Sequence, residues 1–172
     1  NNSIFILVVA TFFFCSTFAF TKELTNDITP LWIVTIRFGL TAFILLGVFF
    51  KQIIKVFTQP LRKELPYLLL LGLVNFIAIL LQIISLEEIP ASNNGFITSF
   101  ALLLVPFIEF IFRKKTVHNN IKLAVMISLI GIYIMSYGLS IPEEFRLGDI
   151  LALLSAVAYA FYIILVDILS KK

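Results

Sequence analysis

The sequence predicts an all-α membrane protein, a polytopic helix bundle of about six spans. Of its 172 residues, 60% are hydrophobic and only 13% are charged, and the mean hydropathy is +1.07. These values lie far outside the range of soluble globular domains. The apolar residues also gather into runs of about twenty, which is the length a helix needs to cross bilayer hydrocarbon.

Six apolar stretches are long enough to span a bilayer as helices. They cover residues 4–21, 31–50, 65–84, 91–112, 121–137 and 148–169. The first is not expected to be a secretory signal, because no cation precedes it and no small-residue cleavage site follows it. The chain opens on Asn1 and not on methionine, so we expect a piece of a longer protein.

The fourth stretch, PASNNGFITSFALLLVPFIEFIFRKK, contains a proline in mid-span. Residues 95–112 alone make about 27 Å of helix, close to the hydrocarbon thickness. Pro106 has no backbone N–H, so the carbonyl of Leu102 lacks its usual helical partner. We therefore expect Pro106 to kink the helix and to make it a moving gate; the alternative is a static kink that improves packing.

The cations predict how the helices are oriented. Ten lie on one side of the predicted bundle: Lys51, Lys55, Arg62, Lys63, Arg113, Lys114, Lys115, Lys122, Lys171 and Lys172. Only Lys22 and Arg146 lie on the other side. Under the positive-inside rule the cation-rich side is cytoplasmic. We therefore expect a multi-pass protein of the cell membrane with both ends of this chain in the cytoplasm.

Four polar side chains on two spans predict a polar path. Asn75 and Gln82 are seven residues apart and share a face of the third helix. They are either hydrogen-bonding contacts between helices or the lining of a substrate path. Asn94 and Thr98 share a face of the fourth helix, where a path is the favoured interpretation.

Two tyrosines near the middle of the last span extend this prediction. Tyr159 and Tyr162, with Ser155 a turn earlier, offer aromatic faces and hydroxyls that suit either packing or the binding of an organic solute. Their depth argues against the interfacial belt in which tyrosines gather. The predicted substrate path is therefore Asn75, Gln82, Asn94, Thr98, Tyr159 and Tyr162.

Two charged residues lie within predicted spans. Glu109 is either a proton-coupling carboxylate or, as we favour, one half of an interfacial ion pair with Arg113, four residues later. Arg37 lies about 9 Å into the second span and does not lose its proton there. We expect an anchor that reaches outward or meets a carbonyl or carboxylate; the alternative is a site for an anionic group of a substrate.

The sequence predicts no catalytic or metal site. The single histidine, His118, has no cysteine or second histidine near it, and Cys15 is expected to be a buried filler without a disulfide partner. No glycine-rich phosphate loop precedes a helix. We expect no cofactor, no metal, no nucleic-acid partner and no enzymatic activity. The expected partners are the lipid bilayer and a small organic solute.

A weak internal similarity relates the two ends of the chain. With a shift of 145 residues, ILVVATFFFCSTFAF aligns with LALLSAVAYAFYIIL, which places Phe14 opposite Tyr159. The repeat unit would then have five helices, and an odd unit puts its second copy across the membrane in the opposite sense. This is the inverted-repeat architecture of many secondary transporters.

Two segments resemble the EamA-domain transporters of the drug/metabolite transporter superfamily. In the first, FFFCSTFAFTKEL…ITPLWIVTIRFGLTAFILL, the matching residues are Lys22, Pro30, Arg37 and Phe38, while Phe14 and Cys15 replace a Trp-Gly pair. In the second, from ASNNGFITSF onward, they are Thr98, Val105, Pro106, Gly131, Gly148 and Asp149. Lys115 stands where many relatives have a glutamate.

The resemblance implies a ten-helix carrier of two repeats with cytoplasmic termini. Residues 1–140 would be the first EamA-like repeat and residues 148–172 the first helix of an inverted second repeat, completed by the rest of that repeat or by a dimer partner. The leading hypothesis is a gradient-driven secondary transporter that carries or exports small organic metabolites or drugs. The alternative is a non-transporting membrane scaffold or assembly subunit.

Overall fold

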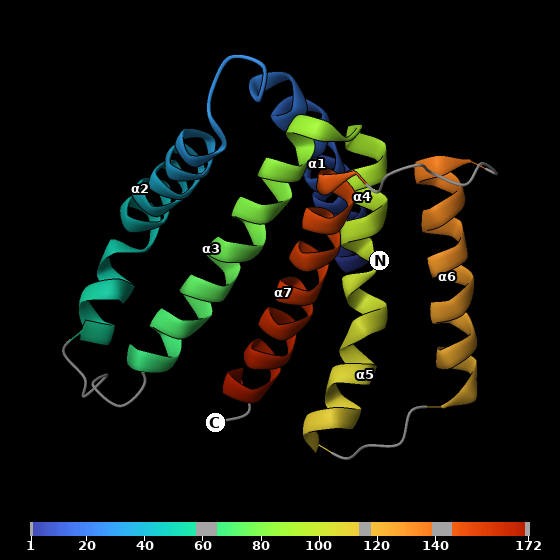
Figure 1. Cartoon of the computed structure of the whole chain (residues 1–172). Helices are drawn as coiled ribbons and strands as arrows, with labels where there is room; N and C mark the ends of the chain where they lie inside the picture. The colour runs from blue at the N-terminus through green and yellow to red at the C-terminus, as the bar shows by residue number, and fades with distance from the viewer. Residues whose placement is uncertain (1, 58–64, 114–117, 139–145, 171–172) are drawn as a thin grey trace.

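The structure is a computed structural model, and it describes residues 2–57, 65–113, 118–138 and 146–170 (Figure 1). Its helices are α1 (Asn2–Leu24), α2 (Pro30–Phe57), α3 (Leu65–Glu88), α4 (Ala91–Ser99), α5 (Ala101–Arg113), α6 (Asn119–Tyr137) and α7 (Leu147–Ser170). α4 and α5 together form one span, so the structure has six candidate membrane spans. The predicted all-α membrane bundle is confirmed within the described residues.

The polar and special residues between the spans explain where several helices begin and end. α2 begins at Pro30, whose missing N–H is one that a first helical turn leaves unpaired in any case. α6 ends before Gly138, whose φ of 69° is a left-handed conformation that glycine adopts without strain. The N–H of Gly138 bonds the carbonyl of Ile134 at 2.8 Å and so closes the last turn.

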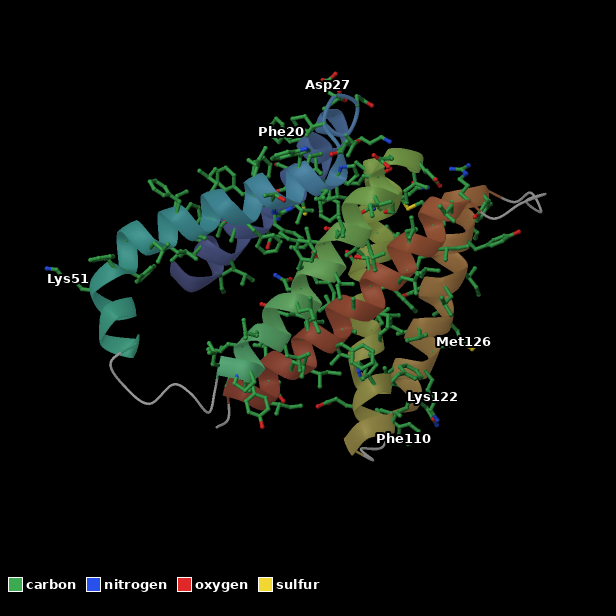
Figure 2. The ribbon with its side chains drawn as sticks, turned by 60° about the vertical axis from the view of Figure 1, so that its left-hand side comes forward. Phe20, Asp27, Lys51, Phe110, Lys122 and Met126 are labelled. Atoms are coloured by element: carbon green, nitrogen blue, oxygen red, sulfur yellow. The ribbon has the colours of Figure 1, made fainter. Side chains whose placement is uncertain are left out.

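Successive spans run in opposite directions, and α7 lies between α3 and the α4–α5 pair (Figure 1). α3 and α7 form the most extensive helix pair of the bundle. α2 packs mainly on α3 at one side of the bundle, and α6 packs on α4 and α5 at the other. Figure 2 shows Asp27 at one end of the bundle and Lys122 at the opposite end.

Small residues on α7 allow it to pack closely on its neighbours. Gly148, Ala152, Ala156 and Ala160 recur at every fourth position, and the three alanines are fully buried. Side chains of this size let helix backbones approach closely in membrane proteins. α7 is therefore the central helix of the described bundle.

The outer faces of α1 and α2 are apolar and exposed, with Phe43 76% exposed. Their threonine hydroxyls bond backbone carbonyls four residues earlier, at 2.8 Å for Thr11, 2.8 Å for Thr35 and 2.7 Å for Thr41. A hydroxyl satisfied within its own helix carries little cost on a surface that faces hydrocarbon. These faces suit contact with lipid or with further apolar helices.

The fourth span is interrupted at Phe100, six residues before Pro106. The N–H of Phe100 bonds the carbonyl of Ile97 at 3.1 Å, and the N–H of Leu103 bonds the carbonyl of Phe100 at 2.9 Å. Both are the i to i+3 bonds of a locally tightened turn. Pro106 itself lies inside α5, which continues through it. The gate predicted at Pro106 stays a prediction.

Candidate functional site

A network of buried hydrogen bonds joins α3, α4 and α7, and Gln82 on α3 is its centre. The Gln82 Nε2 donates to Thr98 Oγ1 at 3.2 Å, and its Oε1 accepts from the Tyr159 hydroxyl at 3.3 Å. Asn94 Nδ2 donates to the Gln82 carbonyl at 3.0 Å and also to the Ser85 hydroxyl. The Thr98 hydroxyl donates to the Asn94 carbonyl at 2.8 Å.

The members of this network need one another because little solvent reaches them. Gln82, Ser85, Asn94 and Thr98 are all less than a tenth exposed. A polar group buried without a partner costs a few kcal/mol, whereas one that is hydrogen-bonded is tolerated. Tyr159 is half-buried, with its hydroxyl on the network. The network therefore holds three helices in register and fixes the Thr98 and Tyr159 side chains.

A cavity of about 770 Å³ lies against this network, between α1, the α4–α5 pair, α6 and α7. Thr98 and Tyr159 form part of its wall. Most of the remaining wall is apolar and includes Phe14, Phe18, Phe96, Leu102 and Met135. Among the described residues that line it, none is charged. Its volume lies within the range of about 300–1,000 Å³ that small-molecule sites occupy.

The structure brings together four of the six residues predicted to form a substrate path. Gln82, Asn94, Thr98 and Tyr159 share the network described above. Asn75 and Tyr162 are half-buried on α3 and α7, outside the network, and of the six residues only Thr98 and Tyr159 line the cavity. The functional roles of all six residues stay predictions. Ser155, expected near the tyrosines, donates instead to the Ala78 carbonyl at 2.9 Å and so links α7 to α3.

Arg37 lies beside the network. It is half-buried and lines a narrow space with Thr17, Thr21 and Gln82. It also lies within electrostatic range of Tyr159. No carboxylate of the described residues forms an ion pair with it. Both roles predicted for Arg37, the anchor and the site for an anionic group of a substrate, stay predictions.

The ion pair predicted between Glu109 and Arg113 stays a prediction. Glu109 is half-buried on α5. The side chain of Arg113 lies outside the described part of the chain.

The prediction for Cys15 was wrong. It was expected to be buried, but it is exposed and lines the cavity. Its apolar neighbours in sequence indicated a hydrophobic environment, which the open side of a membrane bundle supplies as well as a core does. Cys15 is therefore part of the cavity wall and not of the packed core.

Sequence reasoning also missed a set of contacts at one end of the bundle. Lys22 Nζ donates to the carbonyl of Leu86 and, at 3.3 Å, to that of Glu87, so it caps the last turn of α3. The Gly148 N–H donates to Glu88 Oε2 at 2.7 Å, which places a carboxylate at the start of α7. Charged residues at the ends of spans indicated that such contacts could form, but the sequence did not show which helix ends contact each other.

A second contact at this end joins α6 to α7. The Ser136 hydroxyl donates to Asp149 Oδ1 at 3.2 Å, and both side chains are buried. Asp149 lies in the first turn of α7, where the helix dipole favours a negative charge. These contacts fix the end of the bundle that is opposite Lys122.

The comparisons with known proteins bear on this arrangement. The EamA-like transporter family matches residues 1–137. An uncharacterized transporter of Archaeoglobus fulgidus is 27% identical over 160 residues, which are 91% of this chain and 46% of the relative. The chain thus spans about half the length of this curated relative. No solved structure matches the chain significantly. Because the family match extends over most of the helical bundle, the chain belongs to the EamA-like transporter family.

Proposed function

We propose that this chain forms the solute-binding half of a secondary transporter for small organic metabolites or drugs, driven by a gradient. The observation that carries the proposal is the cavity of about 770 Å³ whose wall contains Thr98 and Tyr159. A mostly apolar wall with a few fixed hydroxyls is typical of sites for small organic molecules. Gln82 hydrogen-bonds both hydroxyls, so the positions of Thr98 and Tyr159 depend on how α3, α4 and α7 pack.

The proposal includes a second half that this chain does not contain. We propose that residues 1–140 form one repeat and that residues 148–172 begin an inverted second repeat. Two observations support this: the chain covers 46% of its archaeal relative, and the apolar faces of α1 and α2 are open. In inverted-repeat carriers the substrate site lies near the midplane between the halves. The remainder of the second repeat, or a dimer partner, would complete the wall of the cavity.

The single cysteine of the chain tests the proposal directly. Cys15 lines the cavity and is exposed, so a maleimide should alkylate it, and a bound solute should slow the reaction. We expect about tenfold slower alkylation at a solute concentration ten times Kd, because only the free protein reacts. The measurement is the alkylated fraction against time by intact-protein mass spectrometry, over a panel of amino acids, organic acids, amines and neutral aromatics.

A matched control separates occupation of the cavity from a general effect of the solute. In a Cys15→Ala background, Leu40→Cys places the thiol on an exposed α2 position that lines neither described cavity. Protection should be seen at Cys15 and not at this position. If no solute protects Cys15, or if both thiols are protected alike, the carrier proposal fails and the scaffold alternative gains support.

The proposed orientation has a test of its own. With ten cations on one side and two on the other, we propose that His118 faces the cytoplasm. In the Cys15→Ala background, His118→Cys should react with a membrane-impermeant thiol reagent only after the cells are opened. A cysteine at Asp27, at the opposite end of the bundle, should react in intact cells. The reverse pattern would invert the topology.

A further inference from the structure

Arg37 brings a permanent positive charge into an apolar span. Arginine keeps its proton in proteins, and a charged side chain within a span is costly and commonly functional. Here the side chain is half-buried and lines a narrow space with Thr17, Thr21 and Gln82. No carboxylate among the described residues forms an ion pair with it. The guanidinium thus lies at a polar interior surface with capacity for an anion.

The narrow space and the large cavity are neighbours. Phe14 and Phe18 line both, and their rings meet edge to face with centroids 5.7 Å apart and planes at 80°. Gln82 lines the narrow space and bonds Thr98 and Tyr159 on the cavity wall. One aromatic pair therefore separates a cation from an uncharged, largely apolar cavity.

The space beside Arg37 is small, and the Phe14 and Phe18 rings lie between it and the large cavity. The space measures about 10 Å³, which is room for roughly one water molecule. As it stands, the space is too small for a carboxylate group. Phe14 is 51% exposed, so its ring can turn away from Phe18 without displacing core residues. A turn of the Phe14 ring would join the cavity to the space beside Arg37.

We propose that the solute is an organic monoanion whose carboxylate binds Arg37 while its apolar body occupies the large cavity. A planar guanidinium binds a carboxylate through two parallel hydrogen bonds, and this geometry selects it over neutral and cationic groups. The described wall of the cavity contributes no charge, so Arg37 sets the charge preference. The inference rests on the proposed transport function and adds to it the class of solute.

The test uses three probes with the same ring and different charge: phenylacetate, phenylacetamide and phenethylammonium. Binding is measured by isothermal titration to the purified full-length protein in dodecyl maltoside, which carries no phosphate to compete for Arg37. We expect phenylacetate to bind most tightly. Arg37→Gln should weaken its binding about tenfold to a hundredfold, the loss expected for a charge-assisted hydrogen-bond pair, and should leave phenylacetamide within about twofold.

Two further variants make the result specific. Arg146→Gln removes a cation that stacks on Tyr137, 5.7 Å from the ring centroid, and lines neither cavity, so phenylacetate binding should not change. Arg37→Lys keeps the charge without the planar fork and should retain a reduced preference for phenylacetate. If Arg37→Gln does not fold, the inference is tested by Arg37→Lys and by the affinities of the three probes for the wild-type protein.

The possible failures are distinguishable. If none of the three probes binds, the inference is overturned, and the carrier proposal is decided separately by the solute panel at Cys15. If phenylacetamide binds as tightly as phenylacetate, or if the preference survives in a folded Arg37→Gln protein, the anion site is wrong and the carrier proposal stands. An equal loss of phenylacetate and phenylacetamide binding would assign Arg37 to the fold and would also overturn the inference.

Discussion

Leucine in place of Gly148 is expected to separate α7 from α3 and to prevent a stable bundle. A Cβ atom at this position would lie 2.8 Å from Ile89 Cγ2, 2.9 Å from Glu88 Cβ and 3.1 Å from the Ser85 carbonyl oxygen. Alanine alone should cost about 1–3 kcal/mol, because overpacking shifts the backbone. Leucine adds three more carbons where α3 and α7 meet, and it displaces the Gly148 N–H from Glu88.

Thermal unfolding and size-exclusion chromatography in detergent measure this effect. The control is Gly72→Ala on α3, where a Cβ atom meets nothing within 4 Å. This change should be neutral or should stabilise the helix by up to about 1 kcal/mol, because alanine is the better helix former. A Gly148→Ala protein with the melting temperature of the wild type would show that α7 does not pack as described.

Leucine in place of Gln82 is expected to reduce solute affinity about tenfold and stability more modestly. The substitution fills a similar volume but leaves the Tyr159 hydroxyl without its acceptor and removes a donor to Thr98. Hydrogen bonds between membrane helices average about 0.6 kcal/mol, so two of them are worth roughly 1 kcal/mol of stability. The affinity falls further because Thr98 and Tyr159 lose the positions that the cavity requires.

Asn75→Leu is the matched control for Gln82→Leu. It removes an amide from the same helix at a half-buried position that lines neither described cavity. Cys15 alkylation with and without solute gives the affinity, and thermal unfolding gives the stability. If Asn75→Leu and Gln82→Leu change solute affinity by the same amount, the Gln82 network does not support the site.

The six spans were predictable because length and apolar content decide them almost alone. The ends and bends were harder to predict: α2 extends to Phe57, and Phe49 inside it has φ −107° and ψ 19°, a kink two residues after Gly47 with no proline near it. The break at Phe100 likewise has no proline at its own position. Local sequence fixes which residues are helical, whereas packing decides where a helix bends.

The sequence predicted which polar residues share one face of a helix, but not which residues of different helices contact each other. Spacing placed Asn94 and Thr98 on one side of a helix, and this holds in the structure. Sequence spacing cannot show that Gln82 meets Tyr159, 77 residues away, because that contact depends on α7 packing against α3. Asn75 satisfies the same periodicity as Gln82 but, unlike Gln82, does not line the narrow space beside Arg37. The helix that covers a face decides which of its polar groups become part of a site.

The pairing of α3 with α7 imposes an order on biosynthesis. Leu147 follows Glu88 by 59 residues (147 − 88), so at 5–20 residues per second α3 is complete for about 3–12 seconds before α7 begins to emerge. During that interval Thr98 and Asn94 on α4 can already hydrogen-bond Gln82. The Gln82 Oε1, which accepts from Tyr159 in the complete bundle, has no α7 partner yet. Contacts of α3 with α1, α2 and α4 can therefore form before α7 is present, and lipid or the insertion machinery must cover the face of α3 that α7 later occupies.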